Sequence, residues 1–261
     1  PQNDTALRDS RYLTRWVTYP HTCKHTHLHP SMPTIAITGA AGAIGSTTAQ
    51  VFADAGWTLA LLDYGAENRA ALEDAHPDAH VAAADLTDSD AARDAFDALA
   101  DAAGGLDAVL AIAGGFAMQN AHEATDAEYN RMMNLNVCTL VNTARATLPH
   151  LTANDNSFFL GVSAPGGVNG QAQAALYAAS KGAVAAYVKS LGAEYAAAGL
   201  RASVLYPMGI VDTPANREAM PDGDPSTWVA PQELAESMLH ATTRSPRGHL
   251  PEMRVYAAGS Q

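Results

Sequence analysis

The sequence predicts a single α/β domain in which helices flank a doubly wound parallel sheet of about seven strands. Two observations carry this prediction. From Pro33 onward, short apolar runs alternate with longer alanine-rich stretches, and several of the runs are apolar almost throughout. Strands that helices cover on both faces show such unbroken runs. Repeated alternation of strand and helix implies parallel pairing through right-handed crossovers.

The individual elements follow from these patterns in chain order. The apolar runs predict strands at "TIAIT" (34–38), "TLALLD" (58–63), "HVAAAD" (80–85), "DAVLAIA" (107–113), "SFFLGVS" (157–163), "ASVLYP" (202–207) and "EMRVYAA" (252–258). The stretches between them predict helices at 43–55, 66–75, 88–103, 126–152, 175–198 and 231–243. Because no linker or internal repeat interrupts residues 32–261, we expect one domain there.

Residues 1–31 differ from the rest of the chain, because they mix polar and aromatic types without steady periodicity. Their stretch "HTCKHTHLHP" (21–30) holds four histidines and Cys23, residue types that bind zinc. Ligands on a segment without a scaffold have no fixed geometry. We therefore favour a disordered leader over a metal site and predict no bound metal.

The composition limits the classes of function. A net charge of −12 argues against binding to a phosphate backbone, which needs a basic face. No stretch reaches the roughly 20 apolar residues of a membrane-spanning helix. Two cysteines, Cys23 and Cys138, make no disulfide framework, and free thiols are typical of a reducing compartment. We expect a cytoplasmic protein that binds neither nucleic acid nor membrane and acts on a small molecule.

A nucleotide site is predicted after the first two strands. In "TGAAGAIG" (38–45), Gly39, Gly42 and Gly45 let the backbone approach a pyrophosphate at a helix N-terminus. Asp63 ends the second strand, where an acid can bind the adenosine ribose. A carboxylate there repels a 2′-phosphate, and no lysine or arginine adjoins it, so NAD is favoured over NADP. Asp85 ends the third strand and either binds adenine or caps the next helix.

A proton-transfer pair is predicted at the start of the helix at 175–198. Tyr177 and Lys181 are four residues apart and share one helix face. A neighbouring ammonium favours the phenolate form of a tyrosine, whose ordinary pKa is about 10. The chain has three lysines against twelve arginines, which indicates that an ammonium is needed here. Ser163 is the candidate for a third group that orients a substrate oxygen.

Together these motifs resemble the short-chain dehydrogenase/reductase family, from Pro33 nearly to the C-terminus. The resemblance rests on "TGAAGAIG", Asp63, "DLTD" (85–88), "AGG" (113–115), "NLNV" (134–137), Ser163, "YAASK" (177–181) and "DTP" (212–214). It implies a Rossmann fold and an NAD-dependent oxidoreductase that transfers hydride between nicotinamide and a carbonyl or alcohol. It also implies a homodimer or homotetramer through the helices at 126–152 and 175–198, whose apolar and alanine positions occupy more than one face.

The resemblance further implies a role for each site residue. Tyr177 would donate or accept the proton, and Lys181 would bind the nicotinamide ribose and lower the pKa of the tyrosine. Asn136 would hold a water in a proton relay, and Ser163 would orient the substrate oxygen. The cofactor would contact Gly39, Gly42, Ala43, Ile44, Gly45, Asp63, Asp85, Leu86, Ala113, Gly114, Tyr177, Lys181 and Pro207.

Three features depart from the family pattern. The glycines are spaced G-x-x-G-x-x-G instead of G-x-x-x-G-x-G, and "AIAG" (111–114) replaces the frequent "NNAG". The usual serine position, counted back from Tyr177 without a gap, falls on Ala164. We favour Ser163 as the serine that faces the site, because "GGVNG" (166–170) is flexible enough to absorb a shift of one residue.

A narrower resemblance is to the quinonoid dihydropteridine reductase branch. It rests on "AGGFA" (113–117), "NLNV", the alanine in the serine position and the loop "DTPANREAMPDGDPSTW" (212–228). It implies reduction of an imine, which needs hydride and a proton but no anchored carbonyl oxygen. The loop would cover the substrate, with Met220 and Trp228 either lining the site or seating the loop on the core. A non-catalytic nucleotide sensor on the same fold is the remaining alternative.

Overall fold

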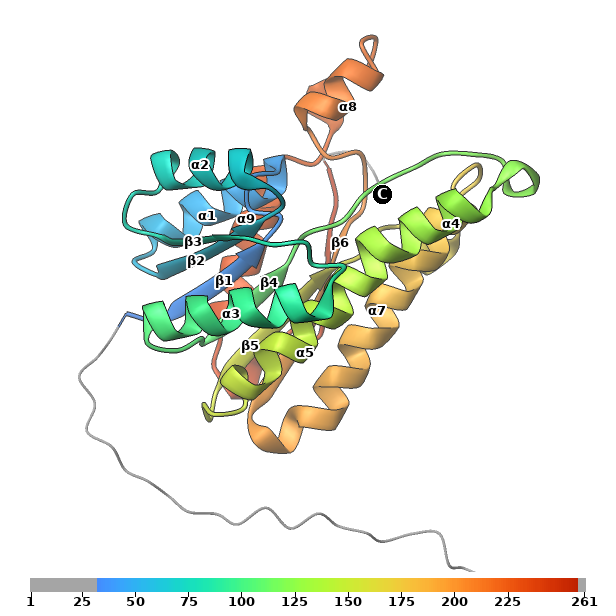
Figure 1. Ribbon diagram of the computed structural model, residues 1–261. Helices are drawn as coiled ribbons and strands as arrows, with labels where there is room; N and C mark the ends of the chain where they lie inside the picture. The colour runs from blue at the N-terminus through green and yellow to red at the C-terminus, as the bar shows by residue number, and fades with distance from the viewer. Residues whose placement is uncertain (1–31, 258–261) are drawn as a thin grey trace, which may run out of the picture. The chain divides into compact units, whose positions relative to one another are not determined.

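The computed structural model of the protein describes residues 32–257, so the predicted leader and its histidine cluster lie outside it. One sheet of parallel strands has the order β3-β2-β1-β4-β5-β6-β7 (Figure 1). The strands are β1 (Thr34–Thr38), β2 (Thr58–Asp63), β3 (His80–Ala83), β4 (Ala108–Ala111), β5 (Ser157–Val162), β6 (Leu200–Pro207) and β7 (Glu252–Val255). The predicted doubly wound sheet is confirmed, and the chain changes direction across the sheet between β1 and β4.

Helices cover both faces of this sheet (Figure 1). One face carries α1 (Ala43–Asp54), α2 (Ala66–Ala75) and α9 (Pro231–Thr243). The other face carries α3 (Ser89–Ala103), α5 (Thr139–Leu151) and α7 (Ala175–Tyr195). Three short helices follow the carboxyl ends of β4, β5 and β6, namely α4 (Asp126–Met133), α6 (Gly166–Asn169) and α8 (Pro214–Ala219).

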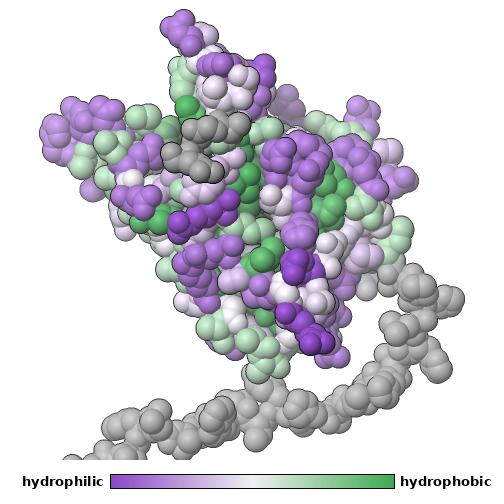
Figure 2. Space-filling model, turned by 180° about the vertical axis from the view of Figure 1, so that it is seen from behind, coloured by the Kyte–Doolittle hydropathy of each residue, from purple (hydrophilic) through white to green (hydrophobic). Residues whose placement is uncertain are grey.

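The core lies in two layers, one on each side of the sheet. Successive side chains of a strand point to opposite faces. On β1, Ile35 and Ile37 pack into the layer beneath α1 and α9, whereas Ala36 packs into the layer beneath α3 and α5. All five residues of β1 are buried, which explains why this run lacks a polar alternation. Hydrophilic side chains dominate the rear of the molecule, with smaller hydrophobic patches between them (Figure 2).

The longer and shorter helices differ from the sequence prediction at three places, namely the segment at 126–152, α6 and α8. The predicted single helix is divided, because a π-helical turn at Asn134–Cys138 separates α4 from α5. π-helical turns are rare in proteins, and those that occur often lie at functional sites. It contains Asn136, one of the predicted site residues. Near the C-terminus, the sequence analysis missed α8, although Thr213 at its N-cap and Pro214 at its first position are ordinary start signals.

The two edge strands are shorter than predicted. β3 pairs only with β2, and their register ends at the pair Asp63 and Ala83. β7 pairs only with β6, and that register ends at Pro207 and Val255. One further backbone hydrogen bond follows each end, from the Ala84 N–H to Asp63 and from the Met208 N–H to Val255, and the regular pairing stops there.

Candidate active site

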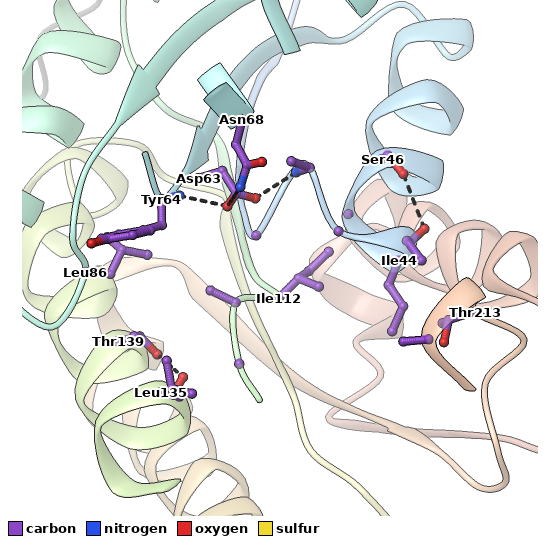
Figure 3. A pocket seen from close by; sticks show the side chains of 18 of the residues that line it. Ile44, Ser46, Asp63, Tyr64, Asn68, Leu86, Ile112, Leu135, Thr139 and Thr213 are labelled. Atoms are coloured by element: carbon purple, nitrogen blue, oxygen red, sulfur yellow. Dashed lines mark hydrogen bonds between the residues drawn. The ribbon is translucent and has the colours of Figure 1, made fainter. Parts of the chain in front are cut away.

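A cleft of 1020 Å³ opens at the carboxyl edge of the sheet. The loops after β1, β2, β3 and β4 line it, together with the start of α5 and the start of α8. In Figure 3, Tyr64 lies beside Leu86 on one side of the cleft, and Thr213 lies near Ile44 on the other. The cleft brings together most of the predicted cofactor-contacting residues, namely Gly39, Gly42, Ala43, Ile44, Gly45, Asp63, Asp85, Leu86, Ala113 and Gly114.

The turn between β1 and α1 depends on the absence of side chains at two glycines. Gly39 has φ +65°, and a Cβ there would lie 2.9 Å from the Cα of Ala113. A Cβ at Gly45 would lie 2.0 Å from the carbonyl oxygen of Gly39. No side chain caps the N-terminus of α1. The backbone N–H groups and the positive end of the helix dipole therefore face a concave, uncapped cradle that fits a pyrophosphate.

The carboxylate of Asp63 is fixed by three hydrogen bonds. Its Oδ2 accepts from the backbone N–H of Ala41 at 2.8 Å. Its Oδ1 accepts from the backbone N–H of Tyr64 at 2.7 Å and from the side-chain amide of Asn68 at 3.0 Å (Figure 3). A carboxylate has about four acceptor positions, so capacity remains for a ribose hydroxyl. The sequence analysis missed Asn68, although its place in the first turn of α2 could have suggested it.

Asp85 does not cap α3. That role belongs to Asp88, whose Oδ1 accepts from the backbone N–H groups of Asp90 and Ala91. Asp85 instead accepts from the backbone N–H and the hydroxyl of Thr87, at 2.8 and 2.6 Å. Of the two alternatives predicted for Asp85, the capping role is wrong, and adenine contact stays a prediction.

The charged side chains that line the cleft are all acidic. None of the residues that line it, all of which lie within residues 32–257, is a lysine, arginine or histidine. Asp63 and Asp85 are its two carboxylates. The residues present thus fit a dinucleotide whose single pyrophosphate rests on the α1 cradle.

Tyr177 and Lys181 occupy successive turns of α7, as the spacing predicts. The Nζ atom of Lys181 donates to the backbone carbonyl of Val162 at 3.0 Å and lies 5.9 Å from the centroid of the Tyr177 ring. Lys181 is 7% exposed. A Cβ at Gly114 would lie 2.6 Å from the Oδ1 of Asn136 and 3.2 Å from the Nζ of Lys181. Lys181, Asn136 and the cleft-lining Gly114 therefore meet at one point.

Burial dominates the electrostatics of this pair. It raises the pKa of the Tyr177 phenol to about 12. It lowers the pKa of the Lys181 ammonium to about 8. The sequence analysis expected the ammonium to lower the pKa of the phenol. The opposite direction results because desolvation of the phenolate outweighs the attraction of a cation that is itself poorly solvated.

Ser163 does not face the cleft or the phenol. Its hydroxyl donates to the backbone carbonyl of Lys181 at 2.8 Å, and the side chain is 2% exposed. A Cβ at Gly167 would lie 2.9 Å from the same hydroxyl oxygen, so α6 covers it. The preference for Ser163 as the group that orients substrate is therefore not supported by its geometry. Ala164 occupies the usual serine position and is also buried.

Asn136 acts on the backbone of Gly115. Its Oδ1 accepts from the Gly115 N–H, and its Nδ2 donates to the Gly115 carbonyl, both at 3.0 Å. The same Nδ2 donates to the hydroxyl of Ser180 at 3.1 Å. All three partners of this buried amide are protein groups. Its role as a holder of water stays a prediction.

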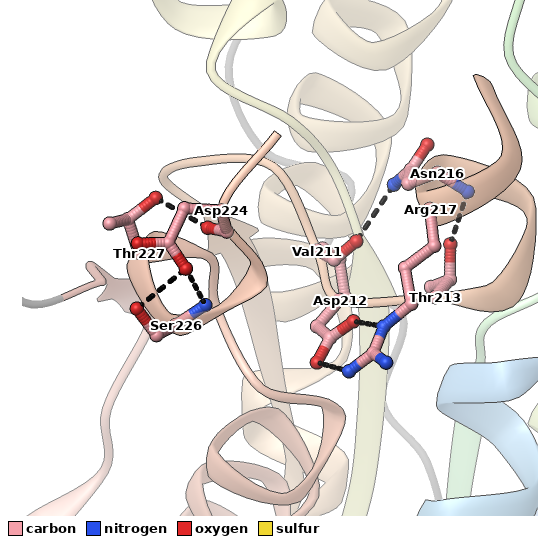
Figure 4. A network of polar contacts seen from close by, with 8 residues as sticks. All are labelled: Val211, Asp212, Thr213, Asn216, Arg217, Asp224, Ser226 and Thr227. Atoms are coloured by element: carbon pink, nitrogen blue, oxygen red, sulfur yellow. Dashed lines mark hydrogen bonds and ion pairs between the residues drawn. The ribbon is translucent and has the colours of Figure 1, made fainter. Parts of the chain in front are cut away.

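The loop at 211–228 is held by local polar contacts (Figure 4). Asp212 forms a bidentate ion pair with Arg217, at 2.6 and 2.8 Å, and the ion pair lowers the pKa of the carboxyl. Thr213 caps α8 and, with the two residues after it, lines the cleft. Trp228 is 9% exposed, and a Cβ at Gly223 would lie 2.5 Å from its ring.

Of this loop, only the start of α8 lines the cleft. Trp228 packs within the loop and seats it, and neither Met220 nor Trp228 lines the cleft. Of the two predicted alternatives for Trp228, the structure favours seating. Pro207 ends β6 as a buried residue and does not line the cleft either.

Within residues 32–257, no three histidine, cysteine or acidic side chains gather where they could hold a metal ion. No helix in the same range combines the length and apolarity needed to cross a bilayer.

The site has the features of a dinucleotide-dependent oxidoreductase. They are the glycine cradle, the acidic end of β2 and the tyrosine–lysine pair, all at one edge of the sheet. The family model for short chain dehydrogenases matches residues 33–223 of this chain. The chain belongs to the short-chain dehydrogenase/reductase family, and the family assignment made from the motifs is confirmed.

Two curated relatives illustrate the range of the family. Cis-4-hydroxycyclohexanecarboxylate dehydrogenase of Sinomonas cyclohexanicum is 33% identical over 215 residues, which cover 77% of this chain and 86% of the relative. Levodione reductase of Leifsonia aquatica is 26% identical over 231 residues, covering 86% and 85%. Among solved structures, 3-ketoacyl-(acyl-carrier-protein) reductase from Brucella melitensis complexed with NADH has a TM-score of 0.77 at 24% identity, covering 88% and 98%. The last likeness concerns the fold alone.

Proposed function

We propose that the protein is an NAD(H)-dependent oxidoreductase that transfers hydride between nicotinamide and a small carbonyl or alcohol. The observation that carries this proposal is the meeting of Lys181 with Asn136 and Gly114, one helical turn from Tyr177, at the edge of the cradled cleft. The family supplies the reaction class. The relative named for cis-4-hydroxycyclohexanecarboxylate supports a secondary alcohol on a ring as the reacting group, and only this part of its substrate is carried over to the present chain.

The residues suggest how the proton is handled. The α1 cradle and Asp63 would hold NADH, whose chemistry is to supply the hydride that a carbonyl carbon accepts. The phenol of Tyr177, whose pKa is raised to about 12, holds its proton at neutral pH and would donate it to the carbonyl oxygen. The ammonium of Lys181, still charged below its pKa of about 8, would stabilise the phenolate that remains. In the oxidative direction both transfers are reversed.

The preference for NAD over NADP rests on charge. Asp63 lies at the end of β2 with its carboxylate fixed, and the lining of the cleft supplies no cation for a 2′-phosphate. Direct measurement of both dissociation constants by cofactor fluorescence tests this preference. An NADPH affinity equal to that of NADH would overturn it.

A second candidate function is reduction of an imine, as in a dihydropteridine reductase. The hydroxyl of Ser163 donates its proton to the Lys181 carbonyl, and Ala164 has no hydroxyl. Reduction of an imine needs a proton donor but no second hydroxyl on an oxygen, so this arrangement suits it. The dihydropterin branch therefore stays the alternative substrate class.

Steady-state turnover with NADH separates these functions. Purified protein is tested against a panel of cyclic and linear ketones and against quinonoid dihydropterin, and Tyr177→Phe serves as the control. Ketone turnover that falls about 10²-fold or more in Tyr177→Phe supports the leading proposal. Dihydropterin turnover alone supports the alternative. Binding of NADH without any turnover, unchanged in Tyr177→Phe, favours a non-catalytic sensor.

We also propose a cytoplasmic homo-oligomer, a dimer or a tetramer, that uses the segments at 126–152 and 175–198. Its support is the family resemblance and the alanine-rich surfaces of these helices. Light scattering coupled to size-exclusion chromatography gives the mass directly. A monomer at micromolar concentration would contradict this proposal.

A further inference from the structure

The segment between Gly115 and Gln119 is fastened at both ends. Asn136 binds the N–H and the carbonyl of Gly115, both at 3.0 Å. At the other end, the N–H of Gln119 donates to the carbonyl of Gln173 at 2.6 Å. Gln173 is the one non-glycine residue with a positive φ, +58°, in the described chain. Strained backbone of this kind is most frequent at ligand sites. We call residues 115–119 the clip.

The clip places Phe116 on the catalytic tyrosine. The rings of Phe116 and Tyr177 meet edge to face, with centroids 4.8 Å apart and planes at 85°. Phe116 nevertheless keeps 51% of its surface exposed, and Met118 keeps 55%. A large apolar side chain that contacts a phenol and stays half exposed is available to a ligand, and Met118 is an exposed apolar side chain two residues further along the clip.

The loops around Tyr177 carry very little charge. Residues 112–121, 163–176 and 208–211, which follow the carboxyl ends of β4, β5 and β6, contain no acidic or basic side chain. The flanking charges include both acids and bases. Arg217 is paired with Asp212, and His122 lies 3.9 Å from Glu123. The pKa of Glu128 is lowered chiefly by its hydrogen bond to the Thr125 backbone and, to a smaller extent, by the charge of Arg131. Apart from the buried ammonium of Lys181, these loops offer a substrate anion no cation in exchange for its lost water.

We propose that Phe116 is a specificity-determining residue that forms, with Met118, an apolar rim seating an uncharged, ring-shaped substrate beside Tyr177. The proposal rests on the proposed function in one respect, namely that Tyr177 meets the substrate oxygen. The ring of the substrate replaces water on the exposed face of Phe116, and its carbonyl or hydroxyl points to the phenol. Substrates that carry a carboxylate or a phosphate are rejected.

A pair of unreactive probes of equal shape tests the rim. Cyclohexanecarboxamide and cyclohexanecarboxylate differ in one formal charge, and both are titrated into the protein–NADH complex by calorimetry at pH 7. The amide is expected to bind at least about tenfold more tightly. Phe116→Ala should weaken amide binding about tenfold, the size of a lost aromatic contact and its area. Met118→Lys should shift the preference toward the carboxylate.

Trp57→Leu is the matched control. Trp57 makes a comparable edge-to-face contact with Phe52, at 5.4 Å and 78°, but it precedes β2 at the opposite edge of the sheet. Probe binding should be unchanged in this variant.

Equal affinity for the two probes, no binding of either, or full amide binding by Phe116→Ala would each overturn the proposal. Because the probes are not turned over, the result does not depend on activity. A protein that selects the amide but reduces no ketone would refute the proposed function and leave the rim intact. A protein that reduces ketones but fails the probe test would do the reverse.

Discussion

The hydroxyl of Ser163 donates a hydrogen bond to the backbone carbonyl of Lys181, 2.8 Å away. Both residues are buried, and the bond joins the end of β5 to the turn of α7 that carries the lysine. A hydroxyl has one proton, so while Ser163 donates to Lys181 it cannot also donate to a substrate carbonyl oxygen. In this arrangement the serine holds the helix that carries Lys181, and its role in orienting the substrate stays a prediction.

Ser163→Ala is accordingly expected to affect stability more than catalysis. The buried Lys181 carbonyl loses a partner, so the free energy of unfolding should fall by about 1 kcal/mol in urea titrations. kcat/KM should change less than about tenfold. Ser190→Ala is the control, because its hydroxyl also bonds a carbonyl of α7 but lies exposed. Loss of turnover by about 10²-fold in Ser163→Ala would show that the serine turns to the substrate during the reaction.

Gly114→Ala should separate groups that now meet. Its Cβ would lie 2.6 Å from the Oδ1 of Asn136 and 3.2 Å from the Nζ of Lys181, so both must move. We expect kcat/KM to fall about 10²-fold with NADH as cofactor, since misplacement by about 1 Å has effects of this size.

Gly182→Ala provides the comparison for this substitution. Gly182 follows Lys181 in α7, and its Cβ would meet the Gly167 carbonyl at an ordinary 3.5 Å. Replacing a mid-helix glycine with alanine should raise the unfolding free energy by about 0.5 to 1 kcal/mol, and turnover should persist. Equal activities of Gly114→Ala and Gly182→Ala would show that the contact of Gly114 with Asn136 and Lys181 is not the centre of the site.

Asp63→Asn should change the choice of cofactor. The amide oxygen can still accept from the Ala41 N–H, but the negative charge at the end of β2 is gone. The Asp63→Asn protein should bind NADPH about tenfold more tightly than the wild type does, because the repulsion of the 2′-phosphate is lost. It should bind NADH more weakly, because a charged acceptor for the ribose is lost. Glu67→Gln removes the same charge from exposed α2 and should leave both dissociation constants unchanged. Unchanged NADPH affinity in Asp63→Asn would refute the charge argument.

The features that sequence predicted well are those that local patterns encode. Strand β1 is buried on both faces, and its unbroken apolar run reports this directly. The glycines at 39 and 45 are required by the backbone of a single turn, so they are visible without knowledge of the rest of the fold. The spacing of Tyr177 and Lys181 is a property of one helix.

The features that sequence did not predict depend on contacts between distant segments. The direction of the Ser163 hydroxyl is decided by a carbonyl of α7 that packing brings opposite. The pKa of Tyr177 is decided by burial, which a residue count between two side chains does not measure. The clip likewise appears only when the backbones of Gln119 and Gln173 meet.

The buried ammonium of Lys181 should make stability depend on pH in a defined direction. Burial lowers its pKa from 10.5 to about 8. Between these values the unfolded chain binds the proton and the folded protein does not, so stability rises with pH across this window. Below pH 8 both states are protonated, and the full cost of burying the charge is present.

Lys181→Met removes this dependence and isolates it. The free energy of unfolding of the wild type minus that of Lys181→Met should rise by about 2 kcal/mol from pH 7 to pH 10. The lost hydrogen bond to the Val162 carbonyl adds a constant offset, which does not change with pH. Lys189→Met is the control among the described lysines, because the hydrogen bond to Glu252 raises the pKa of Lys189 and its charge persists throughout this window. If the unfolding free energy of the wild type minus that of Lys181→Met stays constant or falls between pH 7 and pH 10, Lys181 is solvated in the folded protein.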